Sequence, residues 1–201
     1  MKVFVIVILL SFGLSSCKDQ KIPVQGDTEF QKELNAVFKD ASTTPLKRKD
    51  QKEFEGLEFF KYDSTYVVKA LFTRTENERP FKMKTSTDSL QDYVKYGVVE
   101  FSLKGERYQL NMYQNLELIT QEGYEDYLFL PFLDETNGME SYGGGRYIEL
   151  RTPQSNTITI DFNSAYNPYC AYNEKYSCPL VPRENYLKTR IEAGVKVFKN
   201  H

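Results

Sequence analysis

The residues best suited to chemistry lie between Asp134 and Asn185. Three glycines at 143–145 precede Arg146, and a polar stretch surrounds Asp161. The planar guanidinium of arginine binds carboxylates and phosphates through paired donors, so a cleft built around Arg146 would receive a small anionic ligand. The candidate ligand-binding residues are Tyr142, Arg146, Asp161, Asn163 and Asn167.

The same residues have a structural interpretation. Arg146 and Asp161 each adjoin a strand pattern, and on neighbouring strands they would form a buried or half-buried salt bridge. The glycine run is not followed by the Lys-Ser/Thr and helix of a phosphate-binding Walker loop. Glycines that adopt positive φ angles in a tight connection explain the run more simply.

Asp134, Glu135 and Asn137 offer oxygen ligands that would suit Ca²⁺. Their spacing is not that of an EF-hand, and turn formation accounts for the same residue types. We therefore predict no metal site and no cofactor.

Histidine-dependent catalysis is disfavoured, because the single histidine is the last residue, His201. Ser-His-Asp triads, Cys-His dyads and histidine zinc sites all need an imidazole that is held rigidly. A hydrolase that uses carboxylates alone is an alternative, with Asp134 or Glu184 as the acid and Asp161 as the base. The sequence assigns no catalytic residue.

Cys170 and Cys178 form an even pair, which in an exported protein favours a disulfide. The closed loop is short, so the bond would contribute only about 2.5 kcal/mol. Unpaired thiols and redox chemistry are alternatives, although the sequence has no C-x-x-C motif. Nearby tyrosines would form a platform for a sugar or peptide, or else pack within the core and loops. These are Tyr166, Tyr169, Tyr172 and Tyr176.

The N-terminal region is typical of a lipoprotein signal peptide. Lys2 precedes an apolar run at 3–10 that is too short for a membrane span of about 20 residues. Leu14 and two serines before Cys17 resemble a lipobox. We expect a signal peptide over 1–16, then a lipidated Cys17 and flexible tether over 17–26.

These features predict a lipid-anchored protein of the bacterial cell envelope, on the outer membrane and facing either the periplasm or the cell surface. The expected partners are the membrane, through the lipid on Cys17, and an unknown small ligand or envelope protein. Lys and Arg number 26 against 28 Asp and Glu, with no basic stripe, so nucleic acid is not expected as a partner.

A helix is predicted to open the folded region, where Thr28 begins a capping-box pattern. Apolar residues at helical spacing follow, and the helix should end before 42–45. These residues are Phe30, Leu34, Val37 and Phe38.

Period-two patterns dominate later. Apolar and polar residues alternate over 98–104 and 107–112, on either side of Gly105, which predicts a β-hairpin with one buried face. That face comprises Val99, Phe101, Leu103, Tyr108, Leu110 and Met112. Further strands are expected over 66–72, 127–132, 147–150 and 158–162. The predicted fold is mainly β, an antiparallel sandwich or barrel-like domain with an N-terminal amphipathic helix, in one globular domain over 27–201.

Several motifs together resemble the domain of unknown function 1684 family of bacteria. They are Pro131-Phe132, Thr136-Asn137-Gly138, the segment 142–147, Asp161-Phe162-Asn163, the segment 165–168 and Glu184-Asn185, with the segment 54–57 and Tyr96-Gly97 fitting the earlier part. The resemblance covers nearly the whole mature chain. It implies an uncharacterised protein, often exported or lipid-anchored, and supplies no catalytic residue. The expected function is ligand or protein binding in the envelope.

Overall fold

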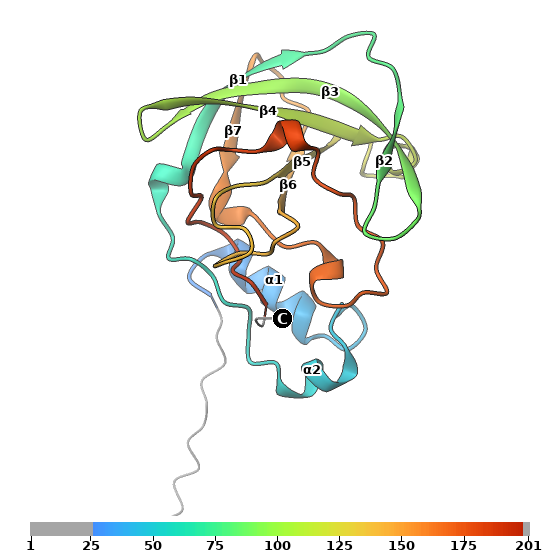
Figure 1. Cartoon of the computed structure of the whole chain (residues 1–201), viewed down its shortest axis with the longest axis vertical. Coiled ribbons are helices and arrows are strands. Elements are labelled where there is room, and N and C mark those ends of the chain that lie inside the picture. Colours follow the sequence, from blue (N-terminus) through green and yellow to red (C-terminus); the bar gives the residue numbers. More distant parts are fainter. Residues whose placement is uncertain (1–25, 199–201) are drawn as a thin grey trace, which may run out of the picture.

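The computed structural model describes residues 26–198. Helices α1 (Glu29–Lys39) and α2 (Arg48–Glu53) come first along the chain (Figure 1). The strands are β1 (Val67–Arg74), β2 (Phe81–Lys84), β3 (Leu90–Leu103), β4 (Glu106–Asn115), β5 (Tyr127–Phe132), β6 (Arg146–Arg151) and β7 (Thr157–Asp161). The predicted signal peptide, Cys17 and the tether as far as residue 25 lie outside the described residues. No helix within 26–198 is long and apolar enough to cross a membrane.

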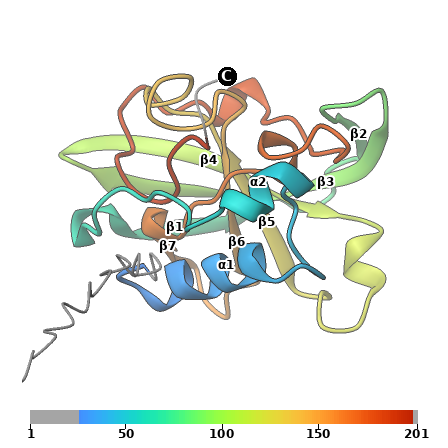
Figure 2. The same ribbon diagram turned by 90° about the horizontal axis from the view of Figure 1, so that it is seen from below.

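The strands form one antiparallel sheet in the order β6-β5-β4-β3-β1-β7, and β2 pairs with the first part of β3. The sheet curls into a half-barrel, and both helices lie at one end of it together with the C-terminal segment (Figures 1 and 2). The predicted mainly β, antiparallel fold with an N-terminal helix is confirmed. Of the two architectures expected, the barrel-like one is observed.

The predicted hairpin consists of β3 and β4, in which Val99 lies opposite Leu110. Lys104 and Gly105 form its two-residue turn with φ angles of 51° and 86°. Two positive φ angles are typical of a type I′ turn, whose twist matches that of the strands it joins. The predicted inward face is buried, except that Tyr108 is half-buried.

One face of the sheet carries the main hydrophobic core, to which every strand except β2 contributes. The C-terminal segment covers this face through Leu187, Ile191 and Ala193, all of which are buried. β5 is buried along its whole length, as expected for a strand enclosed on both sides. The sheet therefore supplies a rigid frame, and the loops after β5 and β7 are held against it.

The predicted N-terminal helix is α1. Oγ1 of Thr28 accepts a hydrogen bond from the amide of Gln31 at 3.2 Å, which caps the first turn. Gln31 reaches back to accept from the amide of Asp27 at 2.7 Å. Phe38 anchors the other end of the helix against Tyr172, with ring centroids 4.6 Å apart. α1 is thereby fixed to the loops that follow β7.

Two elements were not predicted. α2 has the sequence RKDQKE, which contains no apolar residue that would produce a helical hydrophobic pattern. β2 has only Met83 buried among four residues. β3 also begins at Leu90, well before the predicted start, because a bulge between Lys95 and Gly97 shifts the alternation out of phase.

Candidate functional site

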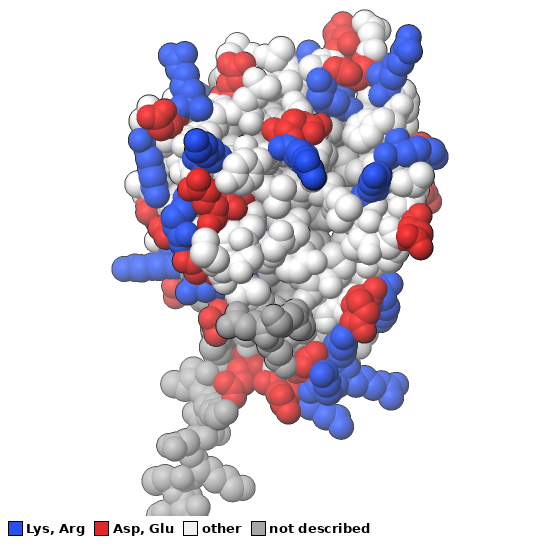
Figure 3. Space-filling model, in the orientation of Figure 1, with Lys and Arg blue, Asp and Glu red and all other residues white. Residues whose placement is uncertain are grey.

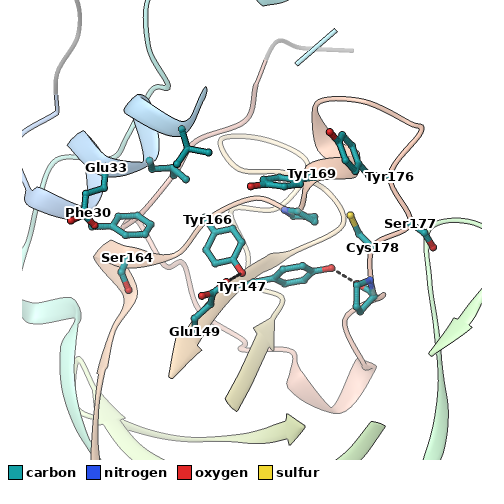
Figure 4. A pocket seen from close by; sticks show the side chains of 14 residues that line it. Phe30, Glu33, Tyr147, Glu149, Ser164, Tyr166, Tyr169, Tyr176, Ser177 and Cys178 are labelled. Carbon is teal, nitrogen blue, oxygen red and sulfur yellow. Dashed lines mark hydrogen bonds between the residues drawn. The ribbon is translucent and has the colours of Figure 1, made fainter. Parts of the chain in front are cut away.

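A cavity of about 610 Å³ lies between α1, the outer part of β6 and the segment 164–179 (Figure 4). Its volume falls within the range of about 300–1,000 Å³ that is usual for small-molecule sites. The residues that line it are Phe30, Glu33, Leu34, Val37, Tyr147, Glu149, Ser164, Tyr166, Pro168, Tyr169, Tyr176, Ser177, Cys178 and Pro179. We refer to it as the aromatic cavity.

Tyrosine rings form much of the wall. Tyr147 and Tyr166 meet edge to face, with centroids 5.9 Å apart and planes at 87°. Tyr169 and Tyr176 form a second such pair at 5.3 Å. The hydroxyl of Tyr147 donates to the carbonyl of Pro179, which ties β6 to the cysteine-containing loop (Figure 4). The two pairs present ring surfaces of fixed orientation to the cavity.

The polar groups of the cavity are acidic or neutral. Glu149 is exposed, and its Oε1 accepts a hydrogen bond from the hydroxyl of Tyr166 at 2.6 Å. Burial raises the pKa of Tyr166, and the nearby Tyr127 and Glu149 raise that pKa further. Glu33 contributes a second carboxylate, and the lining includes no Lys or Arg. The cavity therefore disfavours anions and suits neutral or cationic groups.

Arg146, the centre of the predicted anion site, is fully buried in the interior. Its Nη2 lies 2.8 Å from Oδ2 of Asp134 and donates to the carbonyl of Ile191 at 2.7 Å. Nη1 donates to the carbonyl of Ala193. The suggested pairing with Asp161 is wrong, because Arg146 pairs with Asp134 and β6 is not hydrogen-bonded to β7. Burial lowers the pKa of Arg146, and the charge of Asp134 opposes this shift.

The other residues considered as metal ligands are used in the turn after β5. Oδ1 of Asp134 accepts from the amides of Thr136 at 2.8 Å and Ile191 at 3.1 Å. Asn137 accepts from the amide of Asp134 at 2.7 Å. Across residues 26–198, no group of three or more His, Cys, Asp and Glu side chains is placed to hold a metal ion.

The remaining candidate ligand residues serve separate local structures. Asp161 accepts from both the amide and Nδ2 of Asn163, each at 2.8 Å. Asn167 is buried, and its Nδ2 donates to the carbonyl of Lys196 at 2.8 Å. The hydroxyl of Tyr142 lies 3.9 Å from Sγ of Cys170. The structure does not bring these residues together around Arg146, and none of them lines the aromatic cavity.

The carboxylates suggested for hydrolysis each bond to a different part of the structure. Asp134 is paired with Arg146, and Asp161 caps the short helix after β7. Glu184 accepts from the hydroxyl of Tyr113 at 3.3 Å. Each therefore has its own structural partner.

Cys170 and Cys178 are free thiols, so the favoured disulfide is not present in the structure. The amide of Cys170 nevertheless donates to Sγ of Cys178 at 3.1 Å. A hydrogen bond with Cys178 lowers the pKa of Cys170 to about 6, whereas the same contact and burial raise that of Cys178. The pKa values of the two neighbouring thiols are therefore shifted in opposite directions.

The sequence identified part of the cavity. Tyr166, Tyr169 and Tyr176 were singled out as a potential platform, and they do line it together. Glu149 was not predicted as a site residue, because its position in the sequence is that of an ordinary outward-facing strand residue. Leu34 and Val37 were identified only as apolar residues at helical spacing, and they are half-buried and line the cavity.

Residues 52–196 match a family described as "Protein of unknown function (DUF1684)". The solution NMR structure of an uncharacterised protein from Haloarcula marismortui, an archaeon, is similar to this structure with a TM-score of 0.65. The two chains are 35% identical, and the similarity covers 83% of this chain and 89% of that one. No curated protein matches the chain. The chain belongs to the DUF1684 family.

Proposed function

We propose that this protein is a ligand-binding lipoprotein of the bacterial cell envelope and that the aromatic cavity is its binding site. The observation that supports this most directly is the cavity itself, in which two edge-to-face tyrosine pairs line a volume of about 610 Å³. A ligand of small-molecule size would be enclosed on several sides there.

The chemistry of the lining indicates the class of ligand. Tyrosine rings bind flat or apolar bodies and attract cations through their faces. Glu33 and Glu149 add negative charge without any basic residue to balance it. The proposed ligand therefore has an aromatic or aliphatic body and carries an amine or hydroxyl group. This replaces the anionic ligand that a site around Arg146 would have bound.

Binding is favoured over hydrolysis. Asp134, Asp161 and Glu184 each already accept hydrogen bonds from neighbouring protein groups, and none of them lines the cavity. The envelope location rests on the sequence before the folded region. In this proposal the lipid on Cys17 holds the protein at the membrane, and residues up to 26 separate the binding domain from the lipid headgroups.

The proposal can be tested by calorimetric titration of the full chain in a mild detergent. Three probes share one ring and differ in charge: phenethylamine is cationic, phenylethanol is neutral and phenylacetate is anionic. We expect saturable binding in the order phenethylamine, phenylethanol, phenylacetate. Glu149→Gln should remove most of the advantage of the amine over the alcohol.

Filling the cavity provides the matched control. Leu34→Trp places a large ring in the cavity, whereas Ala36→Trp places it on the exposed side of the same helix. We expect the first variant to lose binding and the second to retain it. Equal affinities in the two variants, or no binding of any probe, would refute the cavity as a small-molecule site.

A further inference from the structure

Cys170 and Cys178 differ in exposure and in support. Cys170 is half-buried on the short helix Tyr169–Ala171, whereas Cys178 is buried. The backbone of Cys178 is fixed by Ser86, whose amide donates to the carbonyl of Cys178 at 2.7 Å and whose Oγ accepts from the amide of Cys178 at 3.0 Å. Cys170 is therefore the more exposed of the two residues, whereas Cys178 is held in place at the edge of the aromatic cavity.

A network of hydroxyl groups holds the loop that carries Cys178. Ser177 is within hydrogen-bonding distance of the hydroxyls of Thr85 at 2.8 Å and Ser89 at 2.6 Å. Thr85 also forms a β-bridge with Pro179. These contacts join the cysteine loop to the connection between β2 and β3, so the position of Cys178 is set by the sheet.

Two contacts place the sulfur of Cys170 beside its neighbours: the hydroxyl of Tyr142 lies 3.9 Å from it, and the amide of Cys170 itself donates to Sγ of Cys178 at 3.1 Å. Interaction with Cys178 is the largest cause of the lowered pKa of Cys170, and Ser86 and Tyr142 lower that pKa further. Burial and, secondarily, the neighbouring Cys170 raise the pKa of Tyr142 to about 12, so its hydroxyl keeps its proton. Hydrogen bonds to the charged form stabilise a thiolate, and the thiolate is the reactive form of cysteine.

We propose that Cys170 and Cys178 form a thiol–disulfide exchange pair, in which Cys170 is the attacking cysteine and Cys178 the resolving cysteine. The partner is a disulfide, either a small molecule or the disulfide of an oxidoreductase. The proposal does not depend on what the aromatic cavity binds.

The reaction proceeds in two balanced steps. The Cys170 thiolate attacks one sulfur of the partner disulfide, which forms a mixed disulfide and releases one partner thiolate. Cys178 then loses its proton and attacks Sγ of Cys170, which closes the internal disulfide and releases the second partner thiolate. Two electrons pass to the partner, and the reverse sequence reduces the pair.

The proton affinities of the two thiols fit this order. The hydrogen bond to Cys170 is the largest cause of the raised pKa of Cys178. Once Cys170 is in a mixed disulfide, it no longer accepts that bond as a thiolate, and Cys178 can ionise more readily. The resolving step therefore becomes easier only after the first step has occurred.

The first test uses the full chain in a mild detergent, with Cys17→Ser so that two thiols remain. The protein is equilibrated in mixtures of reduced and oxidised glutathione, quenched with acid, alkylated and analysed by peptide mass spectrometry. We expect interconversion between two free thiols and one internal disulfide with a single midpoint. A pair that stays oxidised in the most reducing mixture would be a permanent structural disulfide and would overturn the proposal. A pair that never closes would overturn it as well.

Single-cysteine variants test the assigned roles. In Cys178→Ser, the mixed disulfide with glutathione should accumulate on Cys170 because no resolving thiol is present. In Cys170→Ser, Cys178 should acquire little glutathione. The opposite pattern, or equal modification of the two variants, would contradict the assignment.

The rate of alkylation by iodoacetamide, measured against pH, tests the basis of the reactivity. The reaction of Cys170 should be half-maximal near pH 6, where its pKa of about 6 places it. Tyr142→Phe removes one donor and should raise that midpoint by about one pH unit. Tyr172→Phe removes a phenol from the same loop that does not act on the sulfur, and should leave the midpoint unchanged. Identical profiles for wild type and both variants would refute the donor arrangement.

Discussion

Nη2 of Arg146 lies 2.8 Å from Oδ2 of Asp134, and both side chains are completely buried. Arg146 is the first residue of β6, and Asp134 lies in the turn after β5. The guanidinium also packs near the ring of Phe132, 5.2 Å from its centroid. Because the same guanidinium binds the carbonyls of Ile191 and Ala193, the ion pair joins the C-terminal segment to the sheet.

Removing Arg146 should be strongly destabilising. Arg146→Ala leaves the Asp134 carboxylate buried without its cation, which costs about 3–5 kcal/mol. Arg151 is the matched control on the same strand, because its pair with Asp126 is 2.7 Å long but 54% and 55% exposed. Arg151→Ala should cost less than about 1 kcal/mol. Urea unfolding measures both values, and equal losses would mean that burial of the Arg146 pair is unimportant.

The side chain of Asn185 bridges β4 and β5 by bonding to backbone groups of both strands. These strands share only the pairing of Tyr113 with Phe129. The Nδ2 of Asn185 donates to the carbonyls of Asn111 at 2.8 Å and Pro131 at 2.6 Å, and its Oδ1 accepts from the amide of Asn111 at 2.9 Å. The side chain thus satisfies backbone groups where the two strands separate.

Asn185→Ala should therefore cost about 2–4 kcal/mol, because it leaves buried backbone groups of β4 and β5 without partners. Asn173→Ala, at a half-buried turn residue with one hydrogen bond to the amide of Lys175, should cost less than about 1 kcal/mol. The amides of β4 should also exchange hydrogen faster in Asn185→Ala. Unchanged exchange there would show that Asn185 does not hold the strands.

The glycine run contains one position that combines a positive φ angle with close contact to the backbone of a neighbouring strand. Gly145 has a φ angle of 90°, and an added Cβ would lie 2.6 Å from Cγ2 of Val181 and 2.7 Å from the carbonyl oxygen of Phe132. Gly145→Ala should cost about 2 kcal/mol or more. Gly143→Ala meets nothing closer than 3.7 Å and should change stability by less than about 0.5 kcal/mol. Thermal unfolding of the two variants compares them, and equal melting temperatures would contradict this account.

Stability should fall as the pH rises above 10. Burial raises the pKa of Tyr147 above its ordinary value of 10.0. The folded state then retains this proton at pH values where the unfolded state has lost it. The stabilisation is complete below pH 10 and is lost as the pH rises toward the folded-state pKa.

Tyr147→Phe removes this titrating group. Because the hydroxyl donates to the carbonyl of Pro179, the variant should lose about 1 kcal/mol at neutral pH, yet decline less steeply than wild type above pH 10. Ser164→Ala also loses one hydrogen bond but no titrating group. Its stability should therefore fall with pH as steeply as that of wild type. Urea midpoints across this pH range test the prediction. It fails if the midpoint of Tyr147→Phe declines with pH as steeply as that of wild type.

The periodic elements were predictable because their signals are local. The alternation on either side of Gly105 identified the hairpin, and Thr28 identified the start of α1. α2 and β2 escaped prediction because few of their side chains are buried, so no hydrophobic period marks them. The site was predicted less well. Arg146 was considered either as a ligand residue or as half of a buried salt bridge with Asp161, and it forms a buried salt bridge with Asp134 instead.

The sequence by itself determined the fold class, the family and the main turn positions, because hydrophobic period, capping residues and glycines act over a few neighbouring residues. Only the tertiary structure decided which charged residues meet. Asp134 and Asp161 are both acidic residues next to strands. The pairing of β5 with β6 brings Asp134 to Arg146, whereas Asp161 bonds only locally, to Asn163 two residues later. The aromatic cavity was likewise decided by the packing of α1 against a loop more than 100 residues away in sequence, a separation that no local pattern encodes.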